Sequence, residues 1–203
     1  MTNETRRSLH GLAELVLAGP QHRRSGTIRL RATDRGFATV AEPALRVEAD
    51  ALVVGAQSGG DRRIPLAGRT FAQVAADAGV DVGAPVGLYK DGSGVRPDDV
   101  IVMTDAPAIL GALGSGDAAL RHLGDATPVL WPEHFDIGVS LDEVNYGVSA
   151  GDADIDEPYA YVGPWKPREG AFWNKPYGAA RPLKDLPDVL AFFEEGRTAV
   201  QNK

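Results

Sequence analysis

The closely spaced strand patterns in residues 26–66 constrain the fold of this chain more than any other feature. Short segments of alternating apolar and polar residues follow one another here, and the turns between them contain only a few residues. Parallel strands need a crossover of a dozen or more residues, so such short turns permit only antiparallel pairing. The sequence therefore predicts an antiparallel meander with strands at residues 26–33, 37–40, 44–48, 51–55 and 62–66.

Helical patterns flank this meander and recur towards the C-terminus. Apolar residues at helical spacing predict a first helix at 4–18, which should end at Gly19-Pro20. Thr70 and Gln73 form a capping-box pattern, with Gly79 where a helix end favours glycine. Further helices are predicted at 71–78, 106–113, 117–123 and after Asp185, and further strands at 86–89, 100–103, 135–141, 144–149 and 159–163. No internal repeat is visible, and the fold class is α+β: a mostly antiparallel sheet with N-terminal, central and C-terminal helices.

Charge and composition exclude several classes of function. The chain of 203 residues has a formal charge of −7 and a pI near 5.1, which argues against nucleic acid and anionic membranes as partners. It contains no cysteine, so disulfides, thiolate nucleophiles and zinc–thiolate sites are excluded. His10, Gly11 and Glu14 interrupt the first apolar run, which is unlike a signal peptide. We expect a cytoplasmic protein.

Aromatic residues are concentrated in the C-terminal third. Of fourteen, only Phe37, Phe71 and Tyr89 precede residue 131. This distribution indicates either a separate subdomain or one wall of a pocket over the preceding sheet. Because no linker-like composition occurs near residue 128, we expect a single domain over 1–203, with domains at 1–128 and 129–203 as the alternative.

An acidic strip lies between Trp131 and Gly163, with eight acidic residues and no lysine or arginine. Asp152, Asp154 and Asp156 alternate within it, and oxygen ligands at this spacing suit Ca²⁺ or Mg²⁺. An EF-hand is excluded, because Glu157 stands where that loop needs glycine and Gly163 where it needs glutamate. A looser divalent-cation loop and a solvated acidic loop both remain open.

His134 and Asp136 lie at the start of the first of two predicted strands, 135–141 and 144–149, that carry a polar face. Residues two apart on a strand share a face, so these two side chains could meet one substrate. Pairing the strands through their apolar faces adds Asn145 and Ser149 to the polar one. In an enzymatic interpretation His134 is the general acid/base, Asp136 orients it, and Asn145 and Ser149 contact the substrate.

Aromatic side chains near this strip supply further ligand contacts. Rings with polar edges beside carboxylates suit sugars or cationic ligands, although core packing is the alternative role. The candidate ligand-binding residues are Trp131, Asn145, Ser149, Tyr161, Trp165, Trp173 and Asn174.

Four pieces of this region, WPEHFD from Trp131, NYGVSAGD from Asn145, PYAYVGPW from Pro158 and FWN from Phe172, resemble an uncharacterised bacterial family of unknown function. The resemblance covers about the last 75 residues and implies only that these pieces belong together.

The leading functional hypothesis is a small-molecule-binding protein or enzyme. Its acidic, aromatic-lined pocket would take a neutral polar or cationic ligand. A non-catalytic module with a divalent-cation loop and a protein-interaction scaffold are the alternatives.

Overall fold

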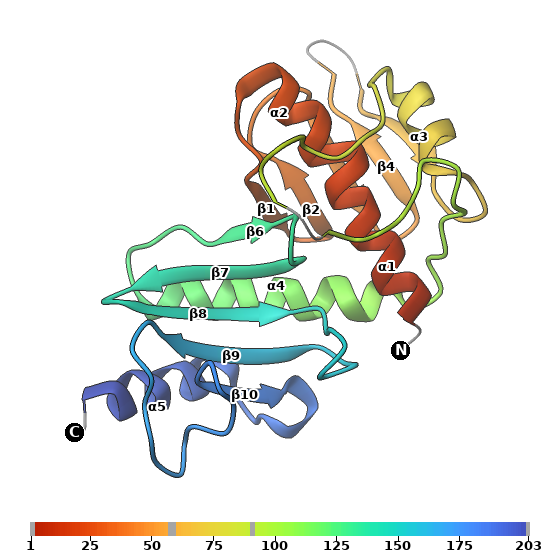
Figure 1. Cartoon of the computed structure of the whole chain (residues 1–203). Helices are drawn as coiled ribbons and strands as arrows, with labels where there is room; N and C mark the ends of the chain where they lie inside the picture. Colours follow the sequence, from red (N-terminus) through yellow and green to blue (C-terminus); the bar gives the residue numbers. More distant parts are fainter. Residues whose placement is uncertain (1–2, 57–59, 90–91, 202–203) are drawn as a thin grey trace.

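The computed structural model describes residues 3–56, 60–89 and 92–201. Within these residues the strands form one antiparallel sheet of ten strands, in the order β10-β9-β8-β7-β6-β1-β2-β3-β4-β5 (Figure 1). Helices lie at the N-terminus, in the middle and at the C-terminus, so the α+β prediction is confirmed. The strands are β1 (Leu30–Thr33), β2 (Gly36–Thr39), β3 (Leu45–Glu48), β4 (Ala51–Val54), β5 (Arg62–Pro65), β6 (Val129–Trp131), β7 (Asp136–Leu141), β8 (Val144–Ser149), β9 (Tyr159–Pro164) and β10 (Ala179–Pro182).

The sheet consists of two meanders that join where β1 pairs antiparallel with β6. Each half of the chain contains, in order, a helical segment, five consecutive strands and a second helical segment. The helices are α1 (Asn3–Gly11), η1 (Leu12–Ala18), α2 (Gly19–Ser25) and α3 (Phe71–Ala78) in the first half, and α4 (Ala106–Leu123), η2 (Leu183–Asp185) and α5 (Val189–Gln201) in the second. The chain therefore repeats a topology, although its sequence shows no repeat. One sheet runs across residue 128, where the two-domain alternative placed its boundary.

The hydrophobic core lies on one face of the sheet. Strand register places Leu30, Leu130, Ile137 and Val148 on that face, and all four are buried. Helix α4 runs along β7 and β8 (Figure 1). It approaches so closely at Gly116 that an added Cβ would lie 2.7 Å from the Cβ of Val148. The opposite face of β6–β9 consequently carries the polar side chains of the acidic strip.

The N-terminal helix is longer than predicted. It continues past Gly19-Pro20 to Ser25 through a π-helical segment, Leu12–Ala18, whose side chains are all buried, Glu14 included. Pro20 lacks a backbone N–H, and the carbonyl oxygen of Leu15, one π-helical turn earlier, accepts from the N–H of Gly83 at 3.0 Å instead. Gly26, in the left-handed conformation with φ 76°, ends the helix.

Other predicted elements differ at loops and at α4. Residues 86–89 and 100–103 do not form strands: Val86 is 87% exposed, and Val100 forms only an isolated antiparallel bridge with Thr70. Helix α4 is continuous through Gly114 and Gly116, because packing on the sheet outweighs their low helix propensity. Helix α3 has the predicted bounds and capping box. Among the described residues, no helix is long and apolar enough to cross a membrane.

Candidate functional site

A cavity of about 990 Å³ opens where the first turns of α1 meet the ends of β7, β8 and β9. Segments far apart in the sequence form its walls: α1, the loop at residues 92–93, the turn before β7 and the loop after β8. Its polar and aromatic lining comprises Arg6, Arg7, His10, Ser93, Glu133, His134, Phe135, Asp136, Ser149, Asp152, Tyr159, Tyr161 and Tyr177. The lining is therefore aromatic and carries carboxylates, and α1 adds cationic side chains.

Asp136, the first residue of β7, is the buried carboxylate of this cavity, with 9% exposure. Its Oδ2 accepts a short hydrogen bond from the hydroxyl of Tyr161. Its Oδ1 is buried and accepts no hydrogen bond from the part of the chain that the structure describes. Burial raises the pKa of Asp136 above its usual value, although the bond from Tyr161 opposes this shift. A buried acceptor without a partner is costly, which makes this oxygen unusual.

Phe135, immediately before Asp136, has a strained backbone with φ of 52°. Such a conformation is rare for a bulky residue and persists only where the surroundings enforce it. The ring is buried, stacks on His10 with centroids 5.6 Å apart, and meets Phe37 edge-on at 5.5 Å. This packing fixes the turn from which Asp136 enters the sheet.

The predicted pairing of His134 with Asp136 is not formed. Strand β7 begins only at Asp136, and the strained turn at Phe135 breaks the alternation that would place both side chains on one face. The side chain of His134 is 72% exposed, and its Nε2 lies 3.2 Å from Oε1 of Glu133. These contacts do not support an acid/base role for His134 oriented by Asp136.

His10 is a cavity residue that sequence reasoning did not identify. Its Nε2 lies 2.7 Å from the carbonyl oxygen of Pro132. Burial lowers the pKa of His10, while the charge of Glu14 opposes this shift. No local pattern could have revealed it, because 122 residues separate it from its partner.

Tyr161 lies over two glycines of the neighbouring strands. It pairs with Gly147 on β8, which pairs with Gly138 on β7. A Cβ added at Gly147 would lie 2.5 Å from Cζ of the Tyr161 ring, and one at Gly138 would lie 3.1 Å from its hydroxyl oxygen. The absence of side chains at both positions therefore lets Tyr161 reach across two strands to Asp136.

Ser149 and Tyr159 lie beside this pair on the same face, with Ser149 directly opposite Asp136. The hydroxyl of Tyr159 donates to Oδ2 of Asp152 at 2.5 Å. The other oxygen of Asp152 accepts from the backbone N–H groups of Asp154 and Ile155, at 2.8 and 2.9 Å. Burial alone would raise the pKa of Asp152, but these hydrogen bonds lower it.

Two of the three aspartates of the predicted cation loop, Asp152 and Asp156, are engaged by different partners. Asp156 forms an ion pair with Arg6 at 2.8 Å, and Asp152 already holds Tyr159 and the loop backbone. No group of three or more His, Asp or Glu among the described residues could hold a metal ion. The Ca²⁺ or Mg²⁺ site stays a prediction that these contacts do not support.

A second, smaller cavity of about 360 Å³ lies further along the same sheet face. Trp131, Asn145, Tyr161 and Arg29 line it, and the guanidinium of Arg29 lies 5.8 Å from the Trp131 ring centroid. Oδ1 of Asn145 accepts from Ser140 at 2.7 Å and from Nε1 of Trp165 at 3.2 Å. Tyr161 lines both cavities and so separates them.

Trp173 and Asn174 line neither cavity. Trp173 packs edge-on against Phe172 at 4.8 Å beside the core. Asn174 donates to the carbonyl oxygen of Ala180 at 3.1 Å and accepts from its N–H at 2.9 Å, so its side chain extends the pairing of β10. Both side chains therefore contact other parts of the protein. For Trp173 this contact is the core packing that was the alternative to a ligand-binding role.

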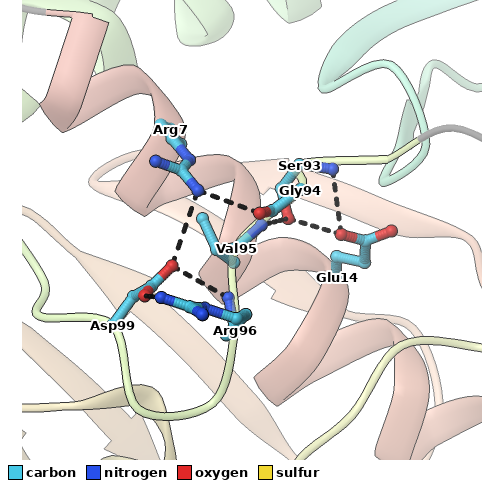
Figure 2. Close-up of polar contacts among 7 residues, drawn as sticks. All are labelled: Arg7, Glu14, Ser93, Gly94, Val95, Arg96 and Asp99. Carbon is cyan, nitrogen blue, oxygen red and sulfur yellow. Dashed lines mark hydrogen bonds and ion pairs between the residues drawn. The ribbon is translucent and has the colours of Figure 1, made fainter.

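Gly92 and Ser93 form part of the cavity wall, and the loop that they begin, residues 92–99, is tied to the N-terminal helix (Figure 2). Buried Glu14, in the π-helical segment, accepts from the N–H of Ser93 at 3.0 Å and from its Oγ at 2.6 Å. Arg7 donates to the carbonyl oxygen of Gly94 at 2.9 Å and also contacts Asp99. These bonds give the cavity a fixed wall.

Comparison with protein-family models, curated proteins and solved structures finds no match. The resemblance of the C-terminal motifs to an uncharacterised bacterial family therefore stays a prediction.

Proposed function

We propose that this protein binds a small organic molecule in the cavity at Asp136, through an N–H or O–H group that the ligand donates to the carboxylate. The observation that carries this proposal is the buried Oδ1 of Asp136, which has no partner among the described residues. An unpaired buried polar group costs about 1–3 kcal/mol, and more for a charged group. A ligand donor would offset that cost, so the site favours neutral polar or cationic molecules.

Two further features support this cavity as the binding site. The strained backbone at Phe135 holds Asp136 in place at the expense of stability, which is typical of functional positions. Three tyrosines, Tyr159, Tyr161 and Tyr177, supply ring surfaces with polar edges. Since Oδ1 is itself covered, binding requires a side chain at the cavity to move.

A larger cavity between α4 and β1–β3, of about 1200 Å³, has no unpaired buried carboxylate among its described residues. Its buried carboxylate, Glu48, is paired through both oxygens, with Arg46 at 2.9 Å and Arg63 at 2.6 Å. The cost of burying this charge is already offset within the protein, and the one buried polar atom of this cavity without a partner among the described residues is the neutral hydroxyl of Thr33.

Thermal denaturation with a panel of primary amines, guanidines and sugars tests the proposal. A compound at about 100 times its Kd adds roughly 2.7 kcal/mol, which raises the melting temperature by about 6 °C for a chain of this length. We expect Asp136→Asn to abolish the shift and the control Asp154→Asn, on the exposed loop, to keep it. Shifts that persist in Asp136→Asn would refute the proposal.

The same assay distinguishes the small-molecule site from the alternative, a non-catalytic module with a divalent-cation loop. Melting in EDTA and then in excess Ca²⁺ or Mg²⁺ should leave the transition unchanged if the aspartate loop holds no cation. A rise that Asp154→Asn removes would favour the cation module over the cavity.

A further inference from the structure

One cross-strand row of side chains connects the two cavities. Leu30 pairs with Leu130 across the antiparallel β1–β6 junction, so Arg29 lies opposite Trp131, and Trp131 pairs in turn with Asp136. The three side chains share the sheet face that carries no helix-packed core. Two strand spacings separate the first from the last, or roughly 10 Å.

The two ends of this row carry opposite charges without a matching partner. The guanidinium of Arg29 lies over Trp131, and within the described parts of the chain it forms no ion pair. Oδ1 of Asp136 is likewise unpaired there. Arginine is suited to carboxylates, which it binds with paired N–H groups, and a buried aspartate is suited to an ammonium group.

One side chain, that of Tyr161, lies where the two cavities meet. Tyr161 lines both cavities, and beneath its ring lie only the backbones of Gly138 and Gly147. Its hydroxyl occupies Oδ2 of Asp136. A ligand ammonium that takes over this hydrogen bond releases the ring, which uncovers the carboxylate and joins the two cavities over the glycines.

We propose that the two cavities are subsites for one elongated zwitterion, whose ammonium group binds Asp136 and whose carboxylate binds Arg29. This inference rests on the proposed function and names its ligand class. Each residue of an extended chain advances about 3.3–3.6 Å, so a di- or tripeptide, or a linear ω-amino acid of similar length, spans roughly 7–10 Å between its charged ends. In the row, Trp131 stands between the two residues that bind the charged ends of such a ligand.

Calorimetric titration with trialanine and its end-blocked forms tests this arrangement. We expect trialanine to bind the wild-type chain, and N-acetylation or C-amidation to weaken it about tenfold or more, since each removes a charged hydrogen-bonding end. In Arg29→Gln the amide should bind as well as the free acid. In Asp136→Asn the acetylated peptide should bind as well as the free amine.

A neighbouring arginine provides the matched control. Arg31→Gln, two residues along β1 and facing the larger cavity, should behave like wild type. Equal binding of trialanine and its amide, with Asp136 still required, would overturn the zwitterion and leave the proposed function intact. Failure of trialanine to bind while simple amines bind through Asp136 would do the same. If no tested ligand needs Asp136 for binding, both the zwitterion proposal and the proposed function are overturned.

Discussion

Gly147→Ala should destabilise the protein because the new methyl group enters the space of the Tyr161 ring. The added Cβ would lie 2.5 Å from Cζ of Tyr161 and 2.7 Å from the carbonyl oxygen of Ile137. Ordinary contacts are about 3.5–4.0 Å. The Ile137 oxygen belongs to the sheet backbone and cannot retreat, so the ring must move by about 1 Å and its bond to Asp136 weakens.

The magnitude follows from two effects. Overpacking of this kind costs about 1–3 kcal/mol, and a weakened hydrogen bond to a charged group adds about 1 kcal/mol. For 203 residues the unfolding entropy is about 0.42 kcal/mol/K, so 1 kcal/mol corresponds to about 2.4 °C. Gly147→Ala should therefore lower the melting temperature by roughly 5–9 °C.

Gly163→Ala is the control for this experiment. Gly163 lies on the neighbouring strand β9, where the nearest atom to an added Cβ is the carbonyl oxygen of Tyr177 at 3.5 Å. Its melting temperature should stay within about 1–2 °C of wild type. Scanning calorimetry of both variants decides the matter: equal transitions for Gly147→Ala and Gly163→Ala would show that the Tyr161 ring does not lie over Gly147.

Three further predictions concern α4, the cavity wall and Asp136. Gly111→Ala, on the exposed side of α4 with no atom near its added Cβ, should raise the melting temperature by about 2 °C, because alanine has the higher helix propensity. Gly116→Ala should lower the melting temperature, because its added Cβ clashes with Val148. Shifts of the same sign for both variants in calorimetry would contradict the packing of α4. Ser93→Ala, which removes the 2.6 Å bond to Glu14, should cost about 1–3 kcal/mol in urea unfolding, and an unchanged midpoint would mean that this bond does not hold the wall. Burial raises the pKa of Asp136, so the unfolded chain loses this proton at lower pH than the native protein, and native stability falls as pH rises from about 3.8 through the native pKa. In urea titrations the wild type should therefore lose stability over that range relative to Asp136→Asn. A constant difference in unfolding free energy between the two proteins from about pH 3 to 7 would contradict the burial of this carboxylate.

Local sequence patterns predicted the elements that are stabilised locally. The strands β2 to β5 and helix α3 lie within a residue or two of their predicted bounds, because alternation, turn residues and a capping box act over a few neighbours. Strands β6 and β10 were missed: β6 has only three residues, and the sequence AARP of β10 shows no alternation of apolar and polar residues.

Part of the candidate site was also predictable. Alternation along β7 and β8 correctly placed Asp136, Asn145 and Ser149 on one face, since side chains on a strand alternate with period two. His134 failed this reasoning, because the turn at Phe135 is set by the packing of its ring against His10 and Phe37 rather than by its neighbours in sequence.

The sequence by itself determined the α+β class, most strands and helices, and the polar face of the acidic strip. Only the tertiary structure decided that β1 pairs with β6, that α1 brings Arg6 and His10 to a strip more than 120 residues away, and that two aspartates of the presumed cation loop are held by Arg6 and Tyr159. The physical reason is one of range. Propensity and periodicity act between near neighbours, whereas the unpaired oxygen of Asp136 is created by burial, which depends on segments from the whole chain.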